Sequence, residues 1–220
     1  MPPSLPVRLR ARLSRAAAPP REELVARHVR GRSFADVGCM WQIHGGIAFA
    51  AEAAGASRVT GMDLMGQTPE YQAEHARRGS AVRFVQGDLH DESALTQLGT
   101  HDVVWCSGVL YHAPHPLLTL ERLRSITGHT LLLATETLPE RPLARNVCVF
   151  APRPGTHPTH TEAFDPARGY VNWYWGITPS ALRAMLAATG FSIVEEHRTA
   201  FHTTVVARVN QTGCPSGQTA

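Results

Sequence analysis

The chain has 220 residues, a net charge of +3 at neutral pH and 43% hydrophobic residues, which is the composition of a globular domain with enough apolar side chains to form a core. No apolar run approaches the ~20 residues that a membrane-spanning helix requires. The cysteines lack metal-ligand spacing and are too few for a disulfide framework; they are Cys39, Cys106, Cys148 and Cys214. We therefore expect one domain without a membrane segment, in a reducing, cytoplasmic compartment. The sequence leaves the oligomeric state open.

All 21 basic residues are arginine, and their distribution along the chain is uneven. The first 32 residues contain Arg8, Arg10, Arg12, Arg15, Arg21, Arg27, Arg30 and Arg32. A basic arm can bind nucleic acid or a membrane surface, and it can also serve as a transit peptide. Five prolines within the first 20 residues oppose a long amphipathic helix. We expect residues 1–20 to form a solvated, disordered arm.

From residue 21 to residue 134, helix-forming segments alternate with short apolar strands. Helices are expected over 21–29, 43–54, 71–78, 93–98 and 116–126, and strands over 34–37, 59–62, 82–85, 102–106 and 130–134. In the segment 102–106, the continuous apolar run after Asp102 is typical of a central strand buried on both faces. This alternation predicts an α/β, Rossmann-like, doubly wound fold with a mostly parallel sheet.

The pattern breaks after the fifth strand. Residues 136–176 are rich in proline and aromatic residues and show no clear periodicity, so we expect a lid or substrate-binding insertion there. Beyond it, a Thr-Pro pair predicts the start of a helix over 180–189.

Two further strands are expected over 191–195 and 203–209. Because they lie close together in the sequence, they are predicted to form an antiparallel pair at the sheet edge, which gives seven strands in all. We expect one domain over 21–209, and a flexible tail over 210–220.

The turn after the first strand has a single glycine in place of a glycine-rich loop. Gly38 allows the backbone to approach a ligand closely, and the helix that follows presents free N–H groups to an anion. A dinucleotide site would need further glycines, whereas Met40 and Trp41 are bulky. The turn therefore favours a ligand without phosphates, although a turn with no ligand would use Gly38 too. The candidate contacts are Asp36, Gly38, Cys39 and Met40.

Carboxylates follow the next two strands. Asp63, with Leu64 beside it, ends the second strand, where a carboxylate can accept hydrogen bonds from a ribose diol. Asp88 follows the third strand and suits the adenine amino group, with Leu89 packing on the ring. The alternatives are a solvated loop acid and a simple β-turn. The shared position at consecutive strand ends favours a nucleoside site.

The fourth strand runs into a loop that carries Ser107, Tyr111 and His112. This loop leaves the sheet next to the expected ligand, so Ser107 is a candidate ligand contact, and Tyr111 and His112 are candidate catalytic residues. An imidazole can act as a general base near neutral pH. The alternative is that His112 only makes structural hydrogen bonds.

The proline-rich insertion supplies candidate substrate contacts. Glu136 begins it, and Trp173 and Tyr174 belong to an aromatic cluster at its end, which could alternatively cap the sheet. The histidine pairs at 112 and 115 and at 157 and 160 have no carboxylate at metal-ligand spacing. We therefore predict no metal.

Five blocks carry a family resemblance: ADVGC, TGMDL, FVQGDL, GVLYHAPHPLLTLERL and TPSALRAMLAATGF. Together they resemble class I S-adenosylmethionine-dependent methyltransferases over residues 33–209. The last two blocks are similar to bacterial enzymes that methylate or carboxymethylate the wobble uridine of tRNA, and to relatives in natural-product pathways. The resemblance implies that Gly38 and Cys39 line the methionine moiety, Asp63 the ribose and Asp88 the adenine, with Tyr111 and His112 beside the transferred group.

The expected function is methyl transfer from S-adenosylmethionine to an oxygen, nitrogen or carbon atom of a small molecule, such as a secondary metabolite. Two alternatives remain open. One is tRNA modification, which the basic arm favours; fewer than 35 residues precede the first strand, and this opposes it. The carboxylate-binding lysine of the tRNA enzymes has no counterpart in a chain without lysine. The other is a scaffold protein that has lost activity, an idea motivated by Met40 and Trp41.

Overall fold

The computed structural model describes residues 18–153 and 173–210. The elements in chain order are α2 (Arg21–Val29), β1 (Ser33–Val37), α3 (Gly46–Ala53), β2 (Arg58–Asp63), α4 (Pro69–Arg78), β3 (Arg83–Gln86), α5 (Glu92–Leu98), β4 (His101–Ser107), the short 3₁₀ helix η1 (Leu110–His112), α6 (Pro116–Ile126), β5 (Thr127–Glu136), β6 (Cys148–Arg153), β7 (Trp173–Ile177), α7 (Pro179–Ala188), β8 (Phe191–Arg198) and β9 (His202–Val209).

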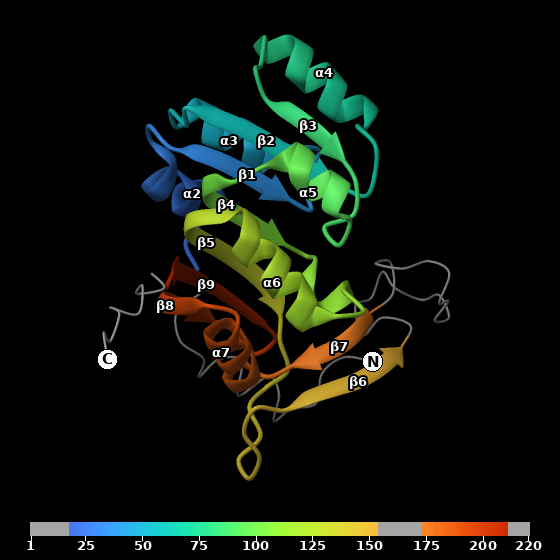
Figure 1. Cartoon of the computed structure of the whole chain (residues 1–220), viewed down its shortest axis with the longest axis vertical. Helices are drawn as coiled ribbons and strands as arrows, with labels where there is room; N and C mark the ends of the chain where they lie inside the picture. Colours follow the sequence, from blue (N-terminus) through green and yellow to red (C-terminus); the bar gives the residue numbers. More distant parts are fainter. Residues whose placement is uncertain (1–17, 154–172, 211–220) are drawn as a thin grey trace, which may run out of the picture.

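Seven strands form one sheet in the order β3-β2-β1-β4-β5-β9-β8 (Figure 1). β1 to β5 are parallel, and β9 runs antiparallel to both β5 and β8. The predicted fold class, a mostly parallel sheet with an antiparallel pair from the carboxyl terminus, is confirmed. The strand order reverses between β1 and β4, which is the topological switch point where ligands of such sheets bind.

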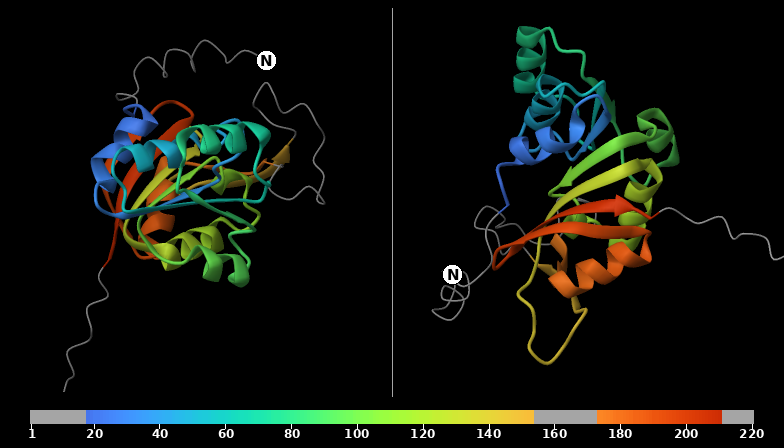
Figure 2. Two further views of the ribbon diagram at one scale, coloured as in Figure 1. Left: turned by 90° about the horizontal axis from the view of Figure 1, so that it is seen from above. Right: turned by 90° about the vertical axis from the view of Figure 1, so that its left-hand side faces the viewer.

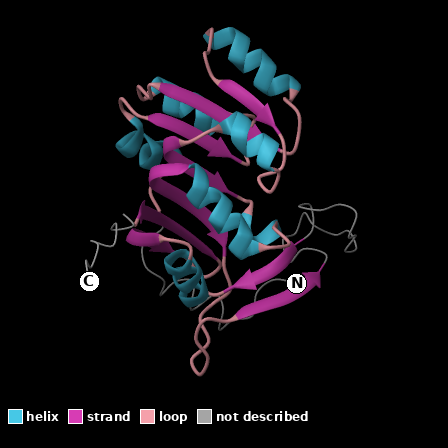
Figure 3. Cartoon of the chain, viewed as in Figure 1, coloured by secondary structure: helices cyan, strands magenta, loops and turns pink. Residues whose placement is uncertain are grey.

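Helices cover both faces of the sheet (Figures 2 and 3). α2, α3 and α4 pack on one face, and α5, α6 and α7 pack on the other. The alternation of side chains along β1 accounts for this, because Phe34 joins the core under α2 and α3 while Ala35 and Val37 join the core under α5 to α7. Since both faces are covered, the strands have to be apolar on both sides, as the run at 102–106 indicated.

The helix expected over 43–54 begins three residues later than predicted, at Gly46. Gln42, His44 and Gly45 have φ values of 57°, 48° and 76°, which are left-handed and interrupt a helix. The amide of Gly45 donates to the carbonyl of Cys39 at 2.7 Å, so these residues form a compact turn. The helical spacing of the apolar residues continues upstream of Gly46, but the turn sets where the helix begins.

The segment 136–176, in which the sequence predicts no strand, contains the strand β6 and most of the strand β7. β6 and β7 pair as a two-stranded antiparallel sheet, with Phe150 opposite Trp175. The Trp175 indole N–H donates to the carbonyl of Pro114 at 3.1 Å, which fastens this hairpin to the loop after β4. A Cβ on Gly176 would lie 2.5 Å from Leu138, so this packing needs a glycine. Pairing between distant residues leaves no local periodicity in the sequence.

The remaining predictions agree closely with the described elements. Thr178 caps α7, and Pro179 is its first residue, as the Thr-Pro pair indicated. The predicted arm at 1–20, the interior of the insertion and the tail at 210–220 fall largely on residues 1–17, 154–172 and 211–220, which lie outside the described residues. The division of the chain into these segments stays a prediction.

Candidate functional site

The carboxyl ends of the parallel strands form one edge of the sheet, and the predicted site residues follow it in order. Val37 is aligned with Met62 of β2 on one side and with Cys106 of β4 on the other. The amide of Gly87 donates to the carbonyl of Asp63 at 2.9 Å, which joins the ends of β3 and β2. The edge from β3 to β4 therefore spans three strand spacings, or about 14 Å.

Gly38 lies at the centre of this edge and cannot be replaced without a clash. Its φ is +81°, and a Cβ there would lie 2.7 Å from Val109 Cγ2 and 2.9 Å from the carbonyl oxygen of Ser107. The turn after β1 thus touches the loop after β4 backbone to backbone. Only a glycine allows this approach, and it leaves the backbone of the turn uncovered by a side chain of its own.

Cys39 and Met40 point away from the edge. Their side chains are 1% and 0% exposed and belong to the core under α2 and α3. A Cβ on Gly61 would lie 2.9 Å from Cys39 Sγ, so the cysteine packs directly on β2. A ligand at the edge could therefore meet only the backbone of these two residues. The bulky Met40 side chain, which the sequence places in the turn, does not occupy the site, and Trp41 is 58% exposed.

Asp36 is buried beneath the turn with an unsatisfied oxygen. It is 1% exposed, and its Oδ2 has no hydrogen-bond partner among the described residues. Burial raises the pKa of Asp36 to about 7. A hydrogen bond from the amide of Ala48, in the first turn of α3, lowers this pKa in part. The negative charge of Asp63 raises it, and the positive charge of Arg21 lowers it. A buried acceptor without a donor is costly, so this oxygen suits a ligand that brings a donor.

Asp63 holds the turn in place. Its Oδ2 accepts from the amide of Met40 at 2.7 Å, and its Oδ1 accepts from the amide of Met65 at 2.9 Å. Burial raises the pKa of the Asp63 carboxyl, and the three amides of Met65, Met40 and Leu64 act in the opposite direction. Each carboxylate oxygen keeps a second lone pair, so the group can also accept from a ribose diol. Leu64 beside it is 43% exposed.

Asp88 and Leu89 follow β3 at the far end of the edge. Asp88 Oδ1 accepts from the amide of His90 at 2.8 Å, which fixes the turn, and the carboxylate stays partly exposed. Leu89 is 5% exposed and packs in the core with Met62 and Ala94. Leu89 can therefore contact an adenine ring only through a small part of its surface.

The loop after β4 brings Ser107, Tyr111 and His112 to the centre of the edge. Ser107 ends β4 beside Ala134 of β5, and the rings of Tyr111 and His112 are 4.2 Å apart on η1. Burial raises the pKa of Tyr111 to about 12; the negative charge of Glu136 also raises it, and the charge of Arg21 lowers it. Tyr111 is therefore protonated at neutral pH and can donate a hydrogen bond.

The three predicted substrate residues come from two strands. Glu136 ends β5 opposite His202 of β9, at the same edge as Ser107. Trp173 and Tyr174 lie on β7. Because β7 packs against η1, all three belong to segments that surround the end of β4.

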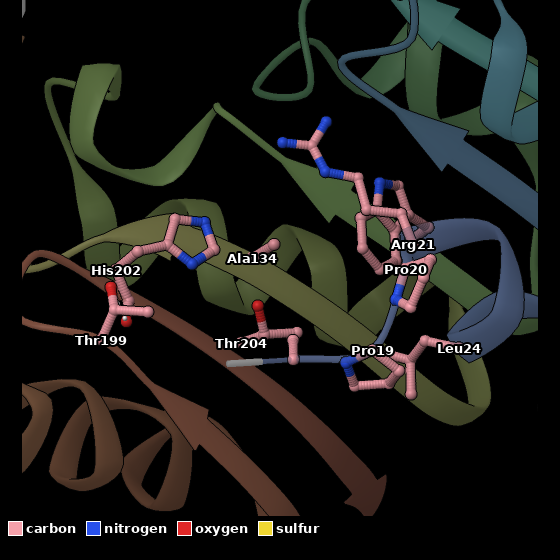
Figure 4. A pocket seen from close by; sticks show the side chains of 10 residues that line it. Pro19, Pro20, Arg21, Leu24, Ala134, Thr199, His202 and Thr204 are labelled. Carbon is pink, nitrogen blue, oxygen red and sulfur yellow. Dashed lines mark hydrogen bonds between the residues drawn. The ribbon is translucent and has the colours of Figure 1, made fainter. Parts of the chain in front are cut away.

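Sequence reasoning missed a cavity of about 250 Å³ beside this edge (Figure 4). It lies between the first turn of α2 and the ends of β4, β5 and β9, and Arg21 and His202 are among its lining residues. No local motif marks either residue, because an arginine after two prolines and a histidine before a strand are common in surface segments. Only the pairing of β9 with β5 brings His202 to the site.

Within 18–153 and 173–210, no three His, Cys, Asp or Glu side chains are grouped as a metal site would require. No helix in the described part of the chain has the length and apolar character needed to cross a membrane.

We predict that Asp36→Asn removes a pH dependence of stability. The pKa of Asp36 is about 7 in the folded chain and near 3.8 when unfolded, so between these pH values the folded chain retains a proton that the unfolded chain releases. Stability therefore falls as pH rises from about 4 to about 7 and then levels off, by up to about 4 kcal/mol. In the variant, urea unfolding measured across this range should show a flatter profile.

The control is Asp102→Asn, at the opposite edge of the sheet. Hydrogen bonds from Ser33 lower the pKa of Asp102, so this carboxylate stabilises the fold above its unfolded pKa, and that contribution is lost in acid. Asp102→Asn should lose stability at neutral pH. An unchanged pH slope in Asp36→Asn would contradict the assignment of the buried proton to Asp36.

Part of the chain is similar in sequence to known proteins. Residues 34–127 match a family described as "Methyltransferase domain". A ubiquinone biosynthesis O-methyltransferase of Vibrio campbellii is 32% identical over 105 residues, which are 46% of this chain and 43% of that protein. The chain thus spans less than half the length of this curated relative, and 35% of a second one from Vibrio parahaemolyticus.

Solved structures share the fold at low sequence identity. The 1,6-didemethyltoxoflavin-N1-methyltransferase of Burkholderia thailandensis, solved with 1,6-didemethyltoxoflavin and S-adenosylhomocysteine, has a TM-score of 0.61 and 20% identity, covering 87% of this chain and 77% of that one. The [4+2]-cyclase SpnF has a TM-score of 0.62 and 16% identity, covering 86% and 79%. The chain therefore has the Rossmann-like fold of these solved structures, and residues 34–127 match a methyltransferase-domain family in sequence.

Proposed function

We propose that this protein is an S-adenosylmethionine-dependent methyltransferase that acts on a small organic molecule. The observation that carries the proposal is the order of groups along the sheet edge. Asp88, Asp63 and Gly38 follow three neighbouring strands, and the buried Asp36 lies beneath the turn. This row offers acceptors for a nucleoside and an amino group, and its turn lacks the further glycines that a pyrophosphate needs.

The residues present fit the cofactor. The orphan Oδ2 of Asp36 is suited to the charged amino group of the methionine moiety, because a cation there would favour the ionised carboxylate. Asp63 would accept from the ribose hydroxyls, Asp88 from the adenine amino group, and the uncovered backbone at Gly38 would lie along the methionine moiety. The exposed Leu64 and the end of β4 at Ser107 complete the row. When bound, the cofactor supplies a methyl group on a positively charged sulfur.

The protein's own contribution is positioning and exclusion of water. Tyr111 is protonated and can donate a hydrogen bond at the end of β4, and the His112 ring lies beside it at a tilt of 40°. The hairpin of β6 and β7 is fastened over this loop by Trp175, so the aromatic residues Trp173 and Tyr174 are on an element next to the reacting groups. We assign Glu136, Trp173 and Tyr174 to the acceptor side.

The comparisons support a small acceptor. The curated relatives are named as O-methyltransferases, and the toxoflavin enzyme methylates a small heterocycle according to its name. We therefore propose an acceptor of the secondary-metabolite type. The cyclase shows that this fold also hosts other chemistry, so cofactor binding and turnover need separate tests.

We predict that the protein binds S-adenosylhomocysteine in a calorimetric titration, and that Asp63→Asn binds it roughly five- to 150-fold more weakly. Loss of a charge-assisted acceptor costs about 1–3 kcal/mol. The matched control is Asp102→Asn, which changes the same group at the opposite edge of the sheet and should leave the affinity unchanged. No binding by the wild-type protein at millimolar ligand would overturn the proposed function.

For the reacting end, we predict that Tyr111→Phe and His112→Ala lower methyl transfer by at least tenfold but change the affinity for S-adenosylhomocysteine by less than threefold. The measurement is turnover with an acceptor found by screening phenols and carboxylates. Unchanged turnover would remove both residues from the site. Binding of the cofactor with no turnover on any acceptor would favour the inactive scaffold.

Modification of the tRNA wobble uridine is a second candidate, supported by the motif resemblance and by the arginines of the first 32 residues. It predicts salt-sensitive binding to tRNA in a gel-shift or anisotropy assay, because phosphate contacts release counterions. Deletion of residues 1–17 removes Arg8, Arg10, Arg12 and Arg15 and should weaken this binding at least tenfold. Equal affinity with and without these residues would reject the arm as an RNA-binding element.

A further inference from the structure

The cavity beside the sheet edge is not lined by Asp36, Gly38, Asp63 or Asp88, the row of residues that we propose to bind the cofactor. Its volume is about 250 Å³, which is more than the ~150 Å³ that holds a benzene molecule and less than the ~300 Å³ of the smallest drug-sized sites. It can therefore enclose a molecule of one or two rings. Its floor includes Ala134 of β5, and Ala134 is aligned with Ser107 at the end of β4. The cavity thus lies beside the end of β4 at Ser107.

The walls of the cavity are mostly apolar. Leu24 of α2, Trp105 of β4 and Ala134 form its inner part, and Pro19 and Pro20 close it from the side of the preceding segment. Trp105 is a large flat side chain that is 1% exposed, so its ring is held firmly by the core. The inner wall is therefore a rigid apolar boundary, which suits the ring of a ligand and leaves its polar group at the mouth of the cavity.

Arg21 and His202 line the mouth of this apolar cavity. Figure 4 shows Arg21 reaching in from the start of α2 and His202 from the start of β9, and both extend toward the space above Ala134. Arg21 is exposed and makes no hydrogen bond or ion pair within residues 18–153 and 173–210. An arginine without a partner at the mouth of an apolar cavity is suited to bind an anionic oxygen.

The surrounding charges agree with an anion at this place. The pKa of His202 is lowered by burial and then by the charge of Arg21, so the imidazole is neutral at neutral pH and can donate its ring N–H. Tyr111 and Asp36 also respond to the charge of Arg21. Glu136 faces His202 across β5 and β9, and its carboxylate is not part of the cavity wall. Among the residues that line the cavity, Arg21 therefore supplies the positive charge.

We propose that this cavity is the acceptor site, and that it selects a flat, one- or two-ring molecule with an acidic hydroxyl group, bound as its oxygen anion by Arg21 and His202. The inference rests on the proposed function. The anionic oxygen forms a bond to the methyl carbon of S-adenosylmethionine while the bond from that carbon to sulfur breaks and its electron pair stays on sulfur. The products are a neutral methyl ether and a neutral thioether. The hydroxyl proton leaves to water before binding.

The test uses 4-nitrophenol as the probe, because its phenolate absorbs visible light and the neutral phenol does not. The full chain is first saturated with S-adenosylhomocysteine, and the probe is then titrated at a pH where it is mostly neutral in water. Binding as the anion should increase the phenolate absorbance and lower the apparent pKa of the probe. The methyl ether 4-nitroanisole, which cannot ionise, should bind at least tenfold more weakly.

Variants assign the effect to the cavity mouth. Arg21→Gln should weaken binding of the phenolate at least tenfold, Arg21→Lys should retain part of it, and Arg27→Gln, in the same helix and paired with Glu23, should leave it unchanged. His202→Gln keeps a donor and should cause a smaller loss than His202→Leu.

The outcomes separate the two proposals. If S-adenosylhomocysteine does not bind, the proposed function fails. If it binds but 4-nitrophenol binds in its neutral form, or Arg21→Gln binds the phenolate as the wild type does, the acceptor assignment is overturned. If Arg21→Gln instead abolishes binding of S-adenosylhomocysteine, Arg21 holds the cofactor, and the assignment is also overturned. Circular dichroism of each variant checks that the substitutions leave the fold intact.

Discussion

The approach of two backbones at Gly38 is the contact on which the rest of the site depends. The turn after β1 meets the carbonyl of Ser107 so closely that a single Cβ would lie 2.9 Å from it. This contact falls at the switch point of the sheet, where the connections of β1 and β4 diverge to opposite faces. Asp63 secures the turn from the other side by accepting the amide of Met40. The site is thus built around a glycine held between two neighbouring strand ends.

From this centre the edge divides into two halves with different chemistry. Toward β2 and β3 lie the carboxylates Asp63 and Asp88, which suit the hydroxyl and amino donors of a nucleoside. Toward β5 and β9 lie an apolar cavity and the cation of Arg21. Asp36 is buried between them and responds to both Asp63 and Arg21. A positively charged methyl donor and an anionic acceptor would each face groups of opposite charge, and the edge would bring them together near Ser107.

Much of the fold could be predicted because its signals are local. The apolar run at 102–106 became the central strand β4, and the Thr-Pro pair began α7. The start of α3 was missed because three left-handed residues, set by a turn bonded to Cys39, override the helical spacing. The pairing of β6 with β7 was missed because it joins segments that are distant in the sequence and have no shared period.

For the site, the sequence by itself determined which strands end in Gly38, Asp63, Asp88 and Ser107, since strand ends follow from apolar periodicity and parallel strands share one edge. Only the tertiary structure decided which side chains near these strand ends remain at the edge of the sheet. Cys39 and Met40 turn into the core because the turn packs on Gly61, so their backbones alone remain at the edge. Arg21 and His202 reach the same cavity because α2 packs on the face of the sheet over β4 and β9 lies beside β5, and such long-range contacts leave no pattern among neighbouring residues.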